Sequence, residues 1–239
     1  MTKEKIFLSI IIPTWNEEDY LPKLLGCLKK QAFKNYEIIV ADANSTDKTR
    51  QIARKYGCKI ANSGGHPGIG RNNGAKKAKG KILLFLDADV KVESNFLENA
   101  VNEINNRDID VAGTRIYPLS NKIIDKIFLG IFNFWISATQ KFYQNAFGGG
   151  IFCKKKLHEK INGFDETIKL SEDMDYVKRA GKFGKFRILK SVKIGFSMRR
   201  YDNEGRLKVG LKLLLSVFHR IFLGEIKSDV FKYEMKYKK

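Results

Sequence analysis

The chain contains little of what marks several common protein classes. Its three cysteines, Cys27, Cys58 and Cys153, are too few and too far apart for a disulfide framework or a cysteine-based zinc site. No run of about 18 apolar residues occurs, so a membrane-spanning helix is not expected. There are only four prolines, and no repeat or low-complexity linker divides the sequence. We therefore expect a protein of a reducing compartment, the cytoplasm, without independent domains.

Two phosphate-binding patterns are also absent. No GxGxxG follows the first apolar run, and GxxxxGK[ST] does not occur. This argues against a nicotinamide dehydrogenase and a P-loop NTPase, and the loop that reads PTWNEE lacks the glycines of a methyltransferase. A phosphate ligand would have to be met by a metal ion and by basic side chains such as Arg71, Arg199 and Arg200.

Acidic residues are scarce relative to basic ones. The chain has 45 lysines and arginines against 26 aspartates and glutamates, a net charge of +19. Such a charge favours an anionic partner: nucleic acid, acidic lipid head groups or a phosphorylated substrate. A lysine-rich solvated surface is the alternative. Binding of nucleic acid would require basic residues interleaved with exposed aromatic ones, or a recognised module, and we find neither, so no nucleic-acid partner is expected.

The first ninety residues alternate between buried strands and helices. Short apolar runs predict strands, and apolar residues at helical spacing between them predict helices. The strands are expected at 7–12, 36–41, 58–61 and 81–86, and the helices at 19–30, 47–56 and 71–79, with a glycine-rich loop at 62–70. Repeated units of this kind predict a parallel sheet with helices on both faces.

The second half is less regular, although the hydrophobic fraction of the whole chain, 43%, is ample for a core. Helices are predicted at 94–105, 123–136, 172–182 (capped by Ser171) and 207–223. Strands are predicted at 111–116 and 151–154, and a strand or hairpin at 188–196.

Acidic residues stand where three of the predicted strands end. Glu17 follows the first strand, Asp42 the second, and Asp87 and Asp89 the fourth. Parallel sheets bind ligands beyond the carboxyl ends of their strands. Asp87 and Asp89 are two residues apart, so in an extended segment both point to one side and can hold Mg²⁺ or Mn²⁺. A solvated turn is the alternative, but the position directly after KILLFL favours a site.

Seven short motifs carry a resemblance. They are SIIIPTWNEE (9–18), ADANSTD (41–47), GRNNG (70–74), LDAD (86–89), GGG (148–150), GFDE (163–166) and SEDMD (171–175). In this order the chain resembles family 2 glycosyltransferases over residues 9–200. The resemblance implies the GT-A fold: an α/β protein with a Rossmann-like nucleotide-binding half fused to an acceptor-binding half around one mixed central sheet. It further implies an inverting transferase that uses a nucleotide-diphosphate sugar donor and a divalent cation.

The resemblance also implies the division of the chain. A single glycosyltransferase domain would cover residues 1–200, with the nucleotide-sugar-binding half at 1–90 and the acceptor half at 91–200. An amphipathic helical extension would follow at 201–239.

The donor-side residues take their roles from the matched motifs. The resemblance implies that Pro13, Glu17 and Asp42 contact the nucleotide base and ribose, and that Arg71, Arg199 and Arg200 contact other parts of the donor. It implies a ribose or metal contact for Asp87 and the main metal ligand at Asp89. It also implies that the backbone at Gly149 and Gly150 approaches the sugar or acceptor closely. Together these residues would hold the nucleotide-diphosphate sugar.

Asp173 matches the catalytic base of the family. In an inverting transfer the acceptor hydroxyl loses its proton as it attacks, so a carboxylate must face the reacting carbon. From position alone, Asp173 would more readily be a cap charge, because a carboxylate in the first turn of a helix is stabilised by the helix dipole. The resemblance favours the base.

Two features of some family members are missing from this chain, and their absence narrows the range of expected reactions. The chain lacks the QxxRW motif and the channel helices of processive synthases, which favours transfer of a single sugar to a hydroxyl acceptor, with a lipid-linked acceptor included. A sugar-nucleotide nucleotidyltransferase is the nearest alternative, although its glycine-rich first loop is absent. A non-catalytic nucleic-acid-binding protein is the alternative from another class, and it leaves the acidic residues unexplained.

The two most apolar of the predicted helices suggest that the protein lies at a membrane surface. The segments 123–136 and 207–223 both carry wide apolar faces, and the second has Lys208, Lys212, His219 and Arg220 on its polar side. Such helices can lie in the head-group layer of an anionic membrane, here the inner face of the cell membrane. Packing on the sheet, or against a second copy in a homodimer, is the alternative.

Overall fold

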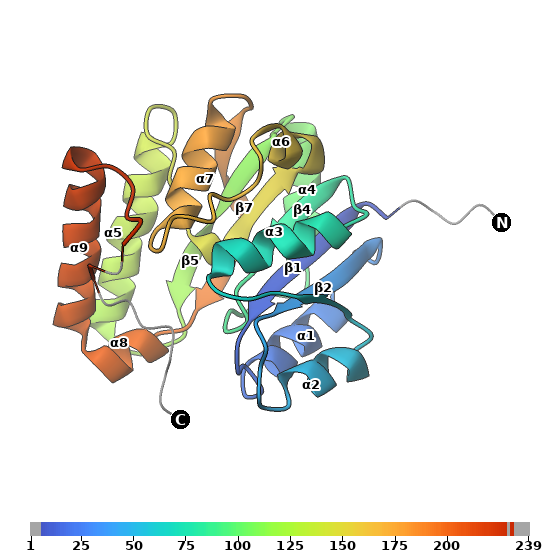
Figure 1. The fold of residues 1–239 in the computed structure, drawn as a ribbon. Helices are drawn as coiled ribbons and strands as arrows, with labels where there is room; N and C mark the ends of the chain where they lie inside the picture. The colour runs from blue at the N-terminus through green and yellow to red at the C-terminus, as the bar shows by residue number, and fades with distance from the viewer. Residues whose placement is uncertain (1–5, 229, 232–239) are drawn as a thin grey trace.

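A computed structural model describes residues 6–228, 230 and 231 of the chain, and Figure 1 shows its fold. Within these residues one sheet of seven strands has the order β3-β2-β1-β4-β6-β5-β7. The strands are β1 (Leu8–Thr14), β2 (Tyr36–Asp42), β3 (Lys59–Asn62), β4 (Ile82–Phe85), β5 (Val111–Pro118), β6 (Ile151–Lys154) and β7 (Phe186–Phe196). The last residues of the predicted extension, 232–239, lie outside the described part.

Helices cover both faces of the sheet. The core on one face includes residues of α1 (Leu21–Lys29), α2 (Thr49–Lys55) and α4 (Phe96–Asn106). The core on the other face includes residues of α3 (Pro67–Lys77), α6 (Lys155–Lys160), α7 (Glu172–Gly181) and α5 (Ile123–Thr139). Two further helices, α8 (Arg199–Glu204) and α9 (Arg206–Phe222), lie beside α5 at one end of the molecule (Figure 1).

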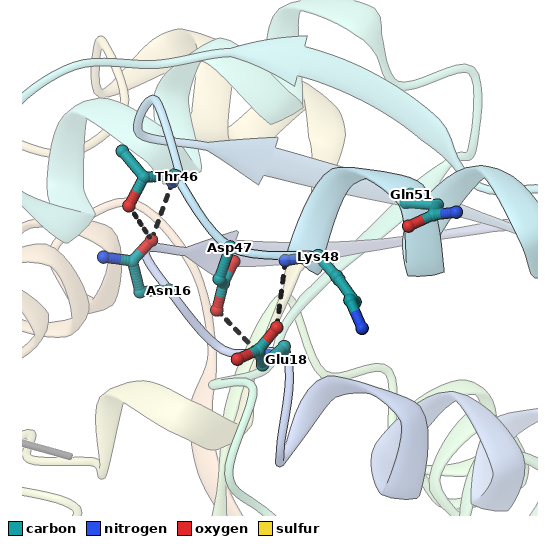
Figure 2. Close-up of a pocket in the computed structure, with 6 residues that line it drawn as sticks. All are labelled: Asn16, Glu18, Thr46, Asp47, Lys48 and Gln51. Carbon is teal, nitrogen blue, oxygen red and sulfur yellow. Dashed lines mark hydrogen bonds between the residues drawn. The ribbon is translucent and has the colours of Figure 1, made fainter.

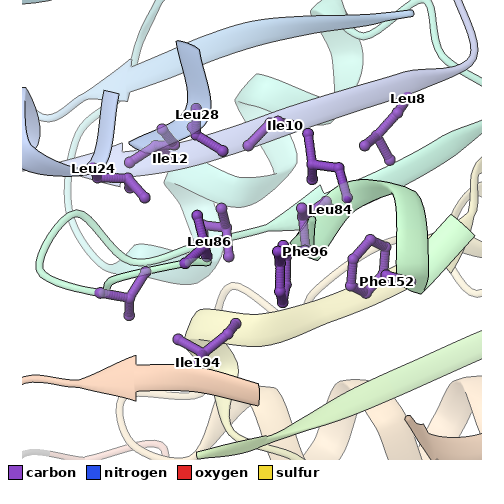
Figure 3. Packing of buried hydrophobic residues seen from close by; sticks show 14 of the residues in the cluster. Leu8, Ile10, Ile12, Leu24, Leu28, Leu84, Leu86, Phe96, Phe152 and Ile194 are labelled. Atoms are coloured by element: carbon purple, nitrogen blue, oxygen red, sulfur yellow. The ribbon is translucent and has the colours of Figure 1, made fainter. Parts of the chain in front are cut away.

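The first four strands are parallel, as predicted. β1 lies between β2 and β4, and β3 pairs with the outer side of β2. Figure 3 shows how alternate side chains of β1, Leu8, Ile10 and Ile12, pack near Leu24 and Leu28 of α1. The intervening Ile11 faces the second core. Because apolar side chains leave β1 on both sides, its sequence reads as an uninterrupted apolar run.

The direction of β6 makes the sheet mixed. β6 runs antiparallel to both β4 and β5, whereas β5 and β7 are parallel. The residues that enter β6 therefore lie at the same edge as those that leave β4. A short 3₁₀ turn at Gly148–Gly150 precedes β6, so it lies next to the segment that carries Asp87 and Asp89. The predicted α/β class with one mixed sheet is confirmed.

Several predicted boundaries were wrong. The loop predicted to run to Gly70 ends earlier, because α3 begins at Pro67, whose ring suits the first turn of a helix. Ser171 precedes α7 but does not cap it with its side chain, since its φ is +63° and no cap hydrogen bond forms. Of the two alternatives predicted for 188–196, the strand is confirmed and the hairpin is not: the segment belongs to β7, which has a register shift against β5. The short helices α6 and α8 were not predicted.

Candidate active site

Arg71 joins three parts of the chain at the carboxyl edge of the sheet. It lies on α3 with only 3% of its side chain exposed. One terminal nitrogen donates to Glu172 Oε1 at 2.6 Å and the other to Asp87 Oδ1 at 2.9 Å. Its guanidinium also lies 5.3 Å from the ring centre of Phe164. Burial acts to lower the pKa of Arg71, but the neighbouring carboxylates Asp87, Glu172 and Asp173 outweigh it and raise the pKa, so this group stays a cation.

Asp173 lies beside this cation in the first turn of α7. Its Oδ1 accepts a hydrogen bond from the backbone N–H of Met174 at 2.8 Å. Burial, and then the charge of Glu172, raise the pKa of Asp173 to about 7, while Arg71 acts in the opposite direction. The helix N-terminus alone would favour a low pKa. The surroundings therefore outweigh the helix dipole, and the carboxyl can exchange a proton near neutral pH.

Glycine is required where the backbone passes between these charged groups. A Cβ on Gly148 would lie 2.8 Å from Asp173 Oδ2 and 3.1 Å from the Arg71 guanidinium. A Cβ on Gly149 would lie 2.8 Å from Asp87 Oδ2. The third glycine, Gly150, faces Thr114 instead. The turn thus brings bare backbone against Asp87 and Asp173.

Arg199 connects the first loop with the second acidic residue of the LDAD motif. It donates to Glu17 through both terminal nitrogens, at 2.6 and 3.0 Å, and its Nε lies 2.9 Å from Asp89 Oδ2. The guanidinium also lies 4.6 Å from the ring centre of Tyr20. α8 supplies this cation, and Arg200 follows in the same turn, half-buried.

Three carboxylates, Glu17, Asp87 and Asp89, lie near one another at this edge. Burial raises the pKa values of Glu17 and Asp89, and the charge of Asp87 raises both further. The three carboxylates are therefore close enough to repel one another, and oxygen ligands are those that Mg²⁺ and Mn²⁺ prefer. In the part of the chain that the structure describes, no three acidic, histidine or cysteine side chains surround one point. A cation here would take Asp87 and Asp89 plus phosphate oxygens of a substrate.

Asp42 is buried at the end of β2 and organises the loop that follows. It accepts hydrogen bonds from the N–H and hydroxyl of Ser45, at 3.1 and 2.5 Å, and Arg50 lies 3.4 Å away. In the sheet register Pro13 of β1 pairs with Ala41, directly before Asp42. A Cβ on Gly70 would lie 3.2 Å from Pro13 Cβ. These residues lie together at the carboxyl ends of β1 and β2.

The loops after β1 and β2 hold each other, as Figure 2 shows. The amide of Thr46 donates to Asn16, that of Lys48 to Glu18, and that of Glu18 to Asp47. An open hollow of about 510 Å³ lies between the loops, lined by Asn16, Glu18, Thr46, Asp47, Lys48 and Gln51. None of the predicted site residues lines the hollow, although Asn16 and Glu18 flank Glu17 in the chain.

The structure also reveals contacts that the sequence did not predict, and it turns inward Arg220, which was expected on the polar side of the helix 207–223. Glu172, the partner of Arg71, precedes the predicted base, and only its place in the SEDMD motif could have pointed to it. Arg220 of α9 turns inward, 5% exposed, and pairs with Glu225. The Nη1 atom of Arg220 lies 2.8 Å from Met174 Sδ. Asp173 is among the acidic groups that raise the pKa of Arg220. No sequence signal linked α9 to the base.

Known proteins resemble this chain in sequence and in fold. A family model described as glycosyl transferase family 2 matches residues 9–153. Poly(ribitol-phosphate) beta-N-acetylglucosaminyltransferase TarS of Staphylococcus aureus is 40% identical over 113 residues, which are 43% of this chain and 20% of TarS. Glycosyltransferase AglE of Haloferax volcanii is 26% identical over 198 residues, 77% of this chain and 64% of AglE. The chain thus spans less than two thirds of the length of either relative.

The name of a third relative includes a dolichyl phosphate saccharide. It is the dolichyl N-acetyl-alpha-D-glucosaminyl phosphate 3-beta-D-2,3-diacetamido-2,3-dideoxy-beta-D-glucuronosyltransferase of Methanococcus voltae. It is 28% identical over 195 residues, 71% of this chain and 60% of the relative.

Solved structures share the fold. TarS residues 1–349 in complex with UDP-GlcNAc superpose with a TM-score of 0.66 and 25% identity, covering 80% of this chain and 58% of that one. The mannosyltransferase PcManGT of Pyrobaculum calidifontis, in complex with GDP-Man and Mn²⁺, superposes with a TM-score of 0.70 and 17% identity, covering 96% and 68%. Since the family model covers more than half of the residues and the neighbours have the GT-A fold, the chain belongs to glycosyl transferase family 2.

Proposed function

We propose that this chain is a metal-dependent inverting glycosyltransferase that moves one sugar from a nucleotide-diphosphate sugar to a hydroxyl acceptor. The observation that carries this proposal is the position of Asp173. Its carboxyl has a pKa raised to about 7 and lies beside Arg71, which in turn contacts Asp87 at the end of β4. A proton acceptor thus lies next to the cationic and acidic groups that suit a diphosphate and its metal.

In the proposed reaction Asp173 takes up the proton of the acceptor hydroxyl. The acceptor hydroxyl attacks the anomeric carbon, the bond from that carbon to the diphosphate oxygen breaks, and the hydroxyl proton passes to the Asp173 carboxylate. A base with a pKa near the working pH transfers protons efficiently. Arg71 limits how far the pKa rises, so part of the carboxyl population is ionised at neutral pH.

The donor side would be formed mainly by residues before position 90. We assign the nucleotide base and ribose to Pro13, Glu17 and Asp42, and the sugar and diphosphate to the backbone at 149–150 and to the arginines at 71, 199 and 200. Asp89 would be the main metal ligand and Asp87 the second. A divalent cation bound there would stabilise the charge that develops on the leaving diphosphate. The structural neighbour PcManGT is in complex with GDP-Man and Mn²⁺, which supports the use of a divalent cation here.

The acceptor would meet the half of the domain that follows residue 90, where Asp173 lies. We propose a lipid-linked hydroxyl acceptor. The name of the Methanococcus voltae relative, which transfers to a dolichyl phosphate saccharide, supports this class. The absence of a QxxRW motif supports the transfer of one sugar rather than a polymer.

A thermal-shift screen tests the proposal. UDP- and GDP-sugars would be compared with and without Mn²⁺, because a ligand that binds the folded state at 100 times its Kd stabilises it by about 2.7 kcal/mol. We expect at least one donor to raise the melting temperature more with Mn²⁺ than without. The best donor would then be incubated with lipid-linked saccharides and the products examined by mass spectrometry. If no nucleotide-diphosphate sugar stabilises the protein, the proposed donor class is wrong.

A further inference from the structure

We propose that the exposed apolar stripes of α5 and α9 together form a docking surface for an anionic lipid bilayer, hereafter the α5–α9 face. The proposal concerns this surface and holds whichever sugar the site transfers. Only its link to a lipid-linked acceptor rests on the proposed function.

Large apolar side chains are concentrated on the two helices. In α5 they are Ile123, Ile124, Ile127, Phe128, Ile131 and Phe134, which are between 40% and 75% exposed. In α9 they are Leu207, Leu211, Leu214, Leu215, Phe218 and Phe222, which are between 47% and 88% exposed. Both sets recur every three or four residues, so each helix carries a continuous apolar stripe. Contiguous exposed apolar surface of this kind marks an interaction site.

The two helices lie side by side, so their stripes belong to one end of the molecule (Figure 1). At their first turns Arg206 of α9 pairs with the buried Asp125 of α5 at 2.7 Å. Along their length Leu129 and Val209 belong to one small core cluster. Each helix packs on its neighbours through a different side, so its apolar stripe stays exposed. The core therefore does not need these stripes.

The charges around the face indicate which partner covers it. Between Ile123 and Lys141 the only carboxylate is Asp125, which is 2% exposed and paired, and there is none between Arg206 and Leu223. Exposed lysines at 126, 141 and 208 lie on or next to the helices. The nearest acidic residues are each held by a basic one, in the pairs Asp202–Arg206, Glu204–Lys212 and Glu225–Arg220.

This composition matches an anionic bilayer better than a second copy. Leucine, isoleucine and phenylalanine can enter the boundary of head groups and acyl chains while lysines contact acidic head groups. A two-fold dimer through the same face would instead bury the lysines of both copies in one interface, where the nearest carboxylates are already paired within each copy. In the described part of the chain no helix is long and apolar enough to cross a membrane, so the face would lie on the bilayer.

The α5–α9 face is also joined to the segment that carries the candidate base. Beyond α9 the backbone forms an antiparallel bridge between Ile226 and Leu170, just before α7. Arg220 of α9 reaches Met174, the residue after Asp173. A docked bilayer would therefore lie on the side of the molecule that carries the base, where a lipid-linked hydroxyl could reach it.

Vesicle flotation tests the surface directly. The full chain would be mixed with phosphatidylcholine vesicles with or without phosphatidylglycerol, at low and high salt. We expect flotation with the anionic vesicles, weakened by salt and weaker still with phosphatidylcholine alone. Replacing Phe218 and Phe222 by serine should lower the vesicle partition coefficient roughly tenfold or more. Phe183→Ser is the matched control, because Phe183 is 58% exposed but lies elsewhere, and it should float as the unchanged protein does.

Charge reversal provides a second set of variants that leaves the apolar side chains intact. Lys126→Glu with Lys208→Glu should lower partition into anionic vesicles roughly tenfold or more, since each basic residue near such a surface contributes about 1 kcal/mol. Lys55→Glu, on α2, should not. Circular dichroism melting confirms that each variant folds.

Two outcomes would overturn the proposal. One is a folded protein that stays at the bottom of the gradient with anionic vesicles at low salt. The other is a dimer in solution, measured by light scattering, that Phe218→Ser with Phe222→Ser dissociates while vesicles are not bound, which assigns the face to a second copy. Flotation needs no sugar nucleotide, so a failed transfer assay beside positive flotation would sink the proposed function alone, and the reverse result the docking surface alone.

Discussion

Arg199 and Glu17 lie 182 positions apart in the chain, yet both terminal nitrogens of the arginine donate to the two carboxylate oxygens of the glutamate. The same guanidinium reaches Asp89 through its Nε. A cation of the protein therefore already occupies part of the space around the proposed metal ligand. Metal and arginine must share the negative charge of Asp89.

Removing this arginine should strengthen metal binding in the absence of donor. In Arg199→Met, Asp89 and Glu17 lose their compensating charge and attract Mn²⁺ more strongly. We expect the Kd for Mn²⁺, measured by titration calorimetry, to fall about fivefold, as suits a partly exposed ion pair. Donor affinity should fall, because the arginine is proposed to contact the diphosphate. An unchanged Kd for Mn²⁺ would contradict a shared site.

Replacing Asp89 itself should have the opposite effect on the metal. Asp89→Ala should abolish the Mn²⁺-dependent part of donor stabilisation in a thermal-shift assay, because the main metal ligand is lost. Asp19→Ala is the matched control, since Asp19 is an exposed carboxylate in the segment just after the first loop. A folded Asp89→Ala protein that still responds fully to Mn²⁺ would rule Asp89 out as the ligand.

Asp173→Asn should stop transfer and leave donor binding in place. Asparagine has nearly the same shape but cannot take up the proton, and loss of a general base lowers rates by about 10²–10⁴. Product formation and donor-induced melting shifts would be measured on the same sample. Asp175→Asn, which alters a carboxylate paired with Arg179 in the same helix, should retain most activity. Near-normal turnover in Asp173→Asn would mean that another group is the base.

The pH profile should reflect the raised pKa of Asp173. A base works only when deprotonated, so kcat/KM should be full above the pKa and fall tenfold per pH unit below it. Since burial and Glu172 raise this pKa from 3.8 to about 7, we expect the acid limb well above the range of ordinary carboxylates. Glu172→Gln removes a charge that raises the pKa, so it should move the limb to lower pH. A limb that stays in place or moves upward would refute the assignment.

Two helical glycines should respond oppositely to alanine. A Cβ on Gly74 would lie 2.4 Å from Ile11 Cγ2, where α3 packs on β1, whereas a Cβ on Gly26 of α1 meets nothing within 4 Å. Gly74→Ala should lower the free energy of unfolding by about 1–3 kcal/mol through overpacking. Gly26→Ala should raise it by up to about 1 kcal/mol through helix propensity. Urea denaturation measures both, and equal effects would contradict the packing described.

The sequence predicted the parallel half well because its strands are buried on both faces. A continuous apolar run such as Phe7 to Ile12 predicts a buried strand even when its neighbours in the sheet are unknown. The start of α3 was misplaced because Gly68 and Gly70 resemble loop residues. Both are helical, and a Cβ on Gly70 would lie 3.2 Å from Pro13 Cβ, so a larger residue would have little room there.

The candidate site was predictable only in part. Motif order placed Asp87, Asp89 and Asp173 together, but it did not reveal that Arg71 pairs with Glu172 across 101 positions. That contact depends on how α7 packs against α3, which no local pattern records. The inward turn of Arg220 was missed for a similar reason: on a helical wheel it belongs to the polar side of α9, and only the bridge beyond α9 brings it to Met174.

The place of β6 in the sheet has a consequence for synthesis. The strands β3, β2, β1 and β4 can pair once Phe85 has left the ribosome, whereas β5 neighbours β6 and β7, which are made later. Glu17 and Asp89 meet Arg199 later still. We expect nascent chains stalled far enough along that β4 has left the ribosome to protect β1 from protease, and the carboxyl edge to become protected only when α8 has emerged. Earlier protection of the loop around Glu17 would show that this edge forms without its last cation.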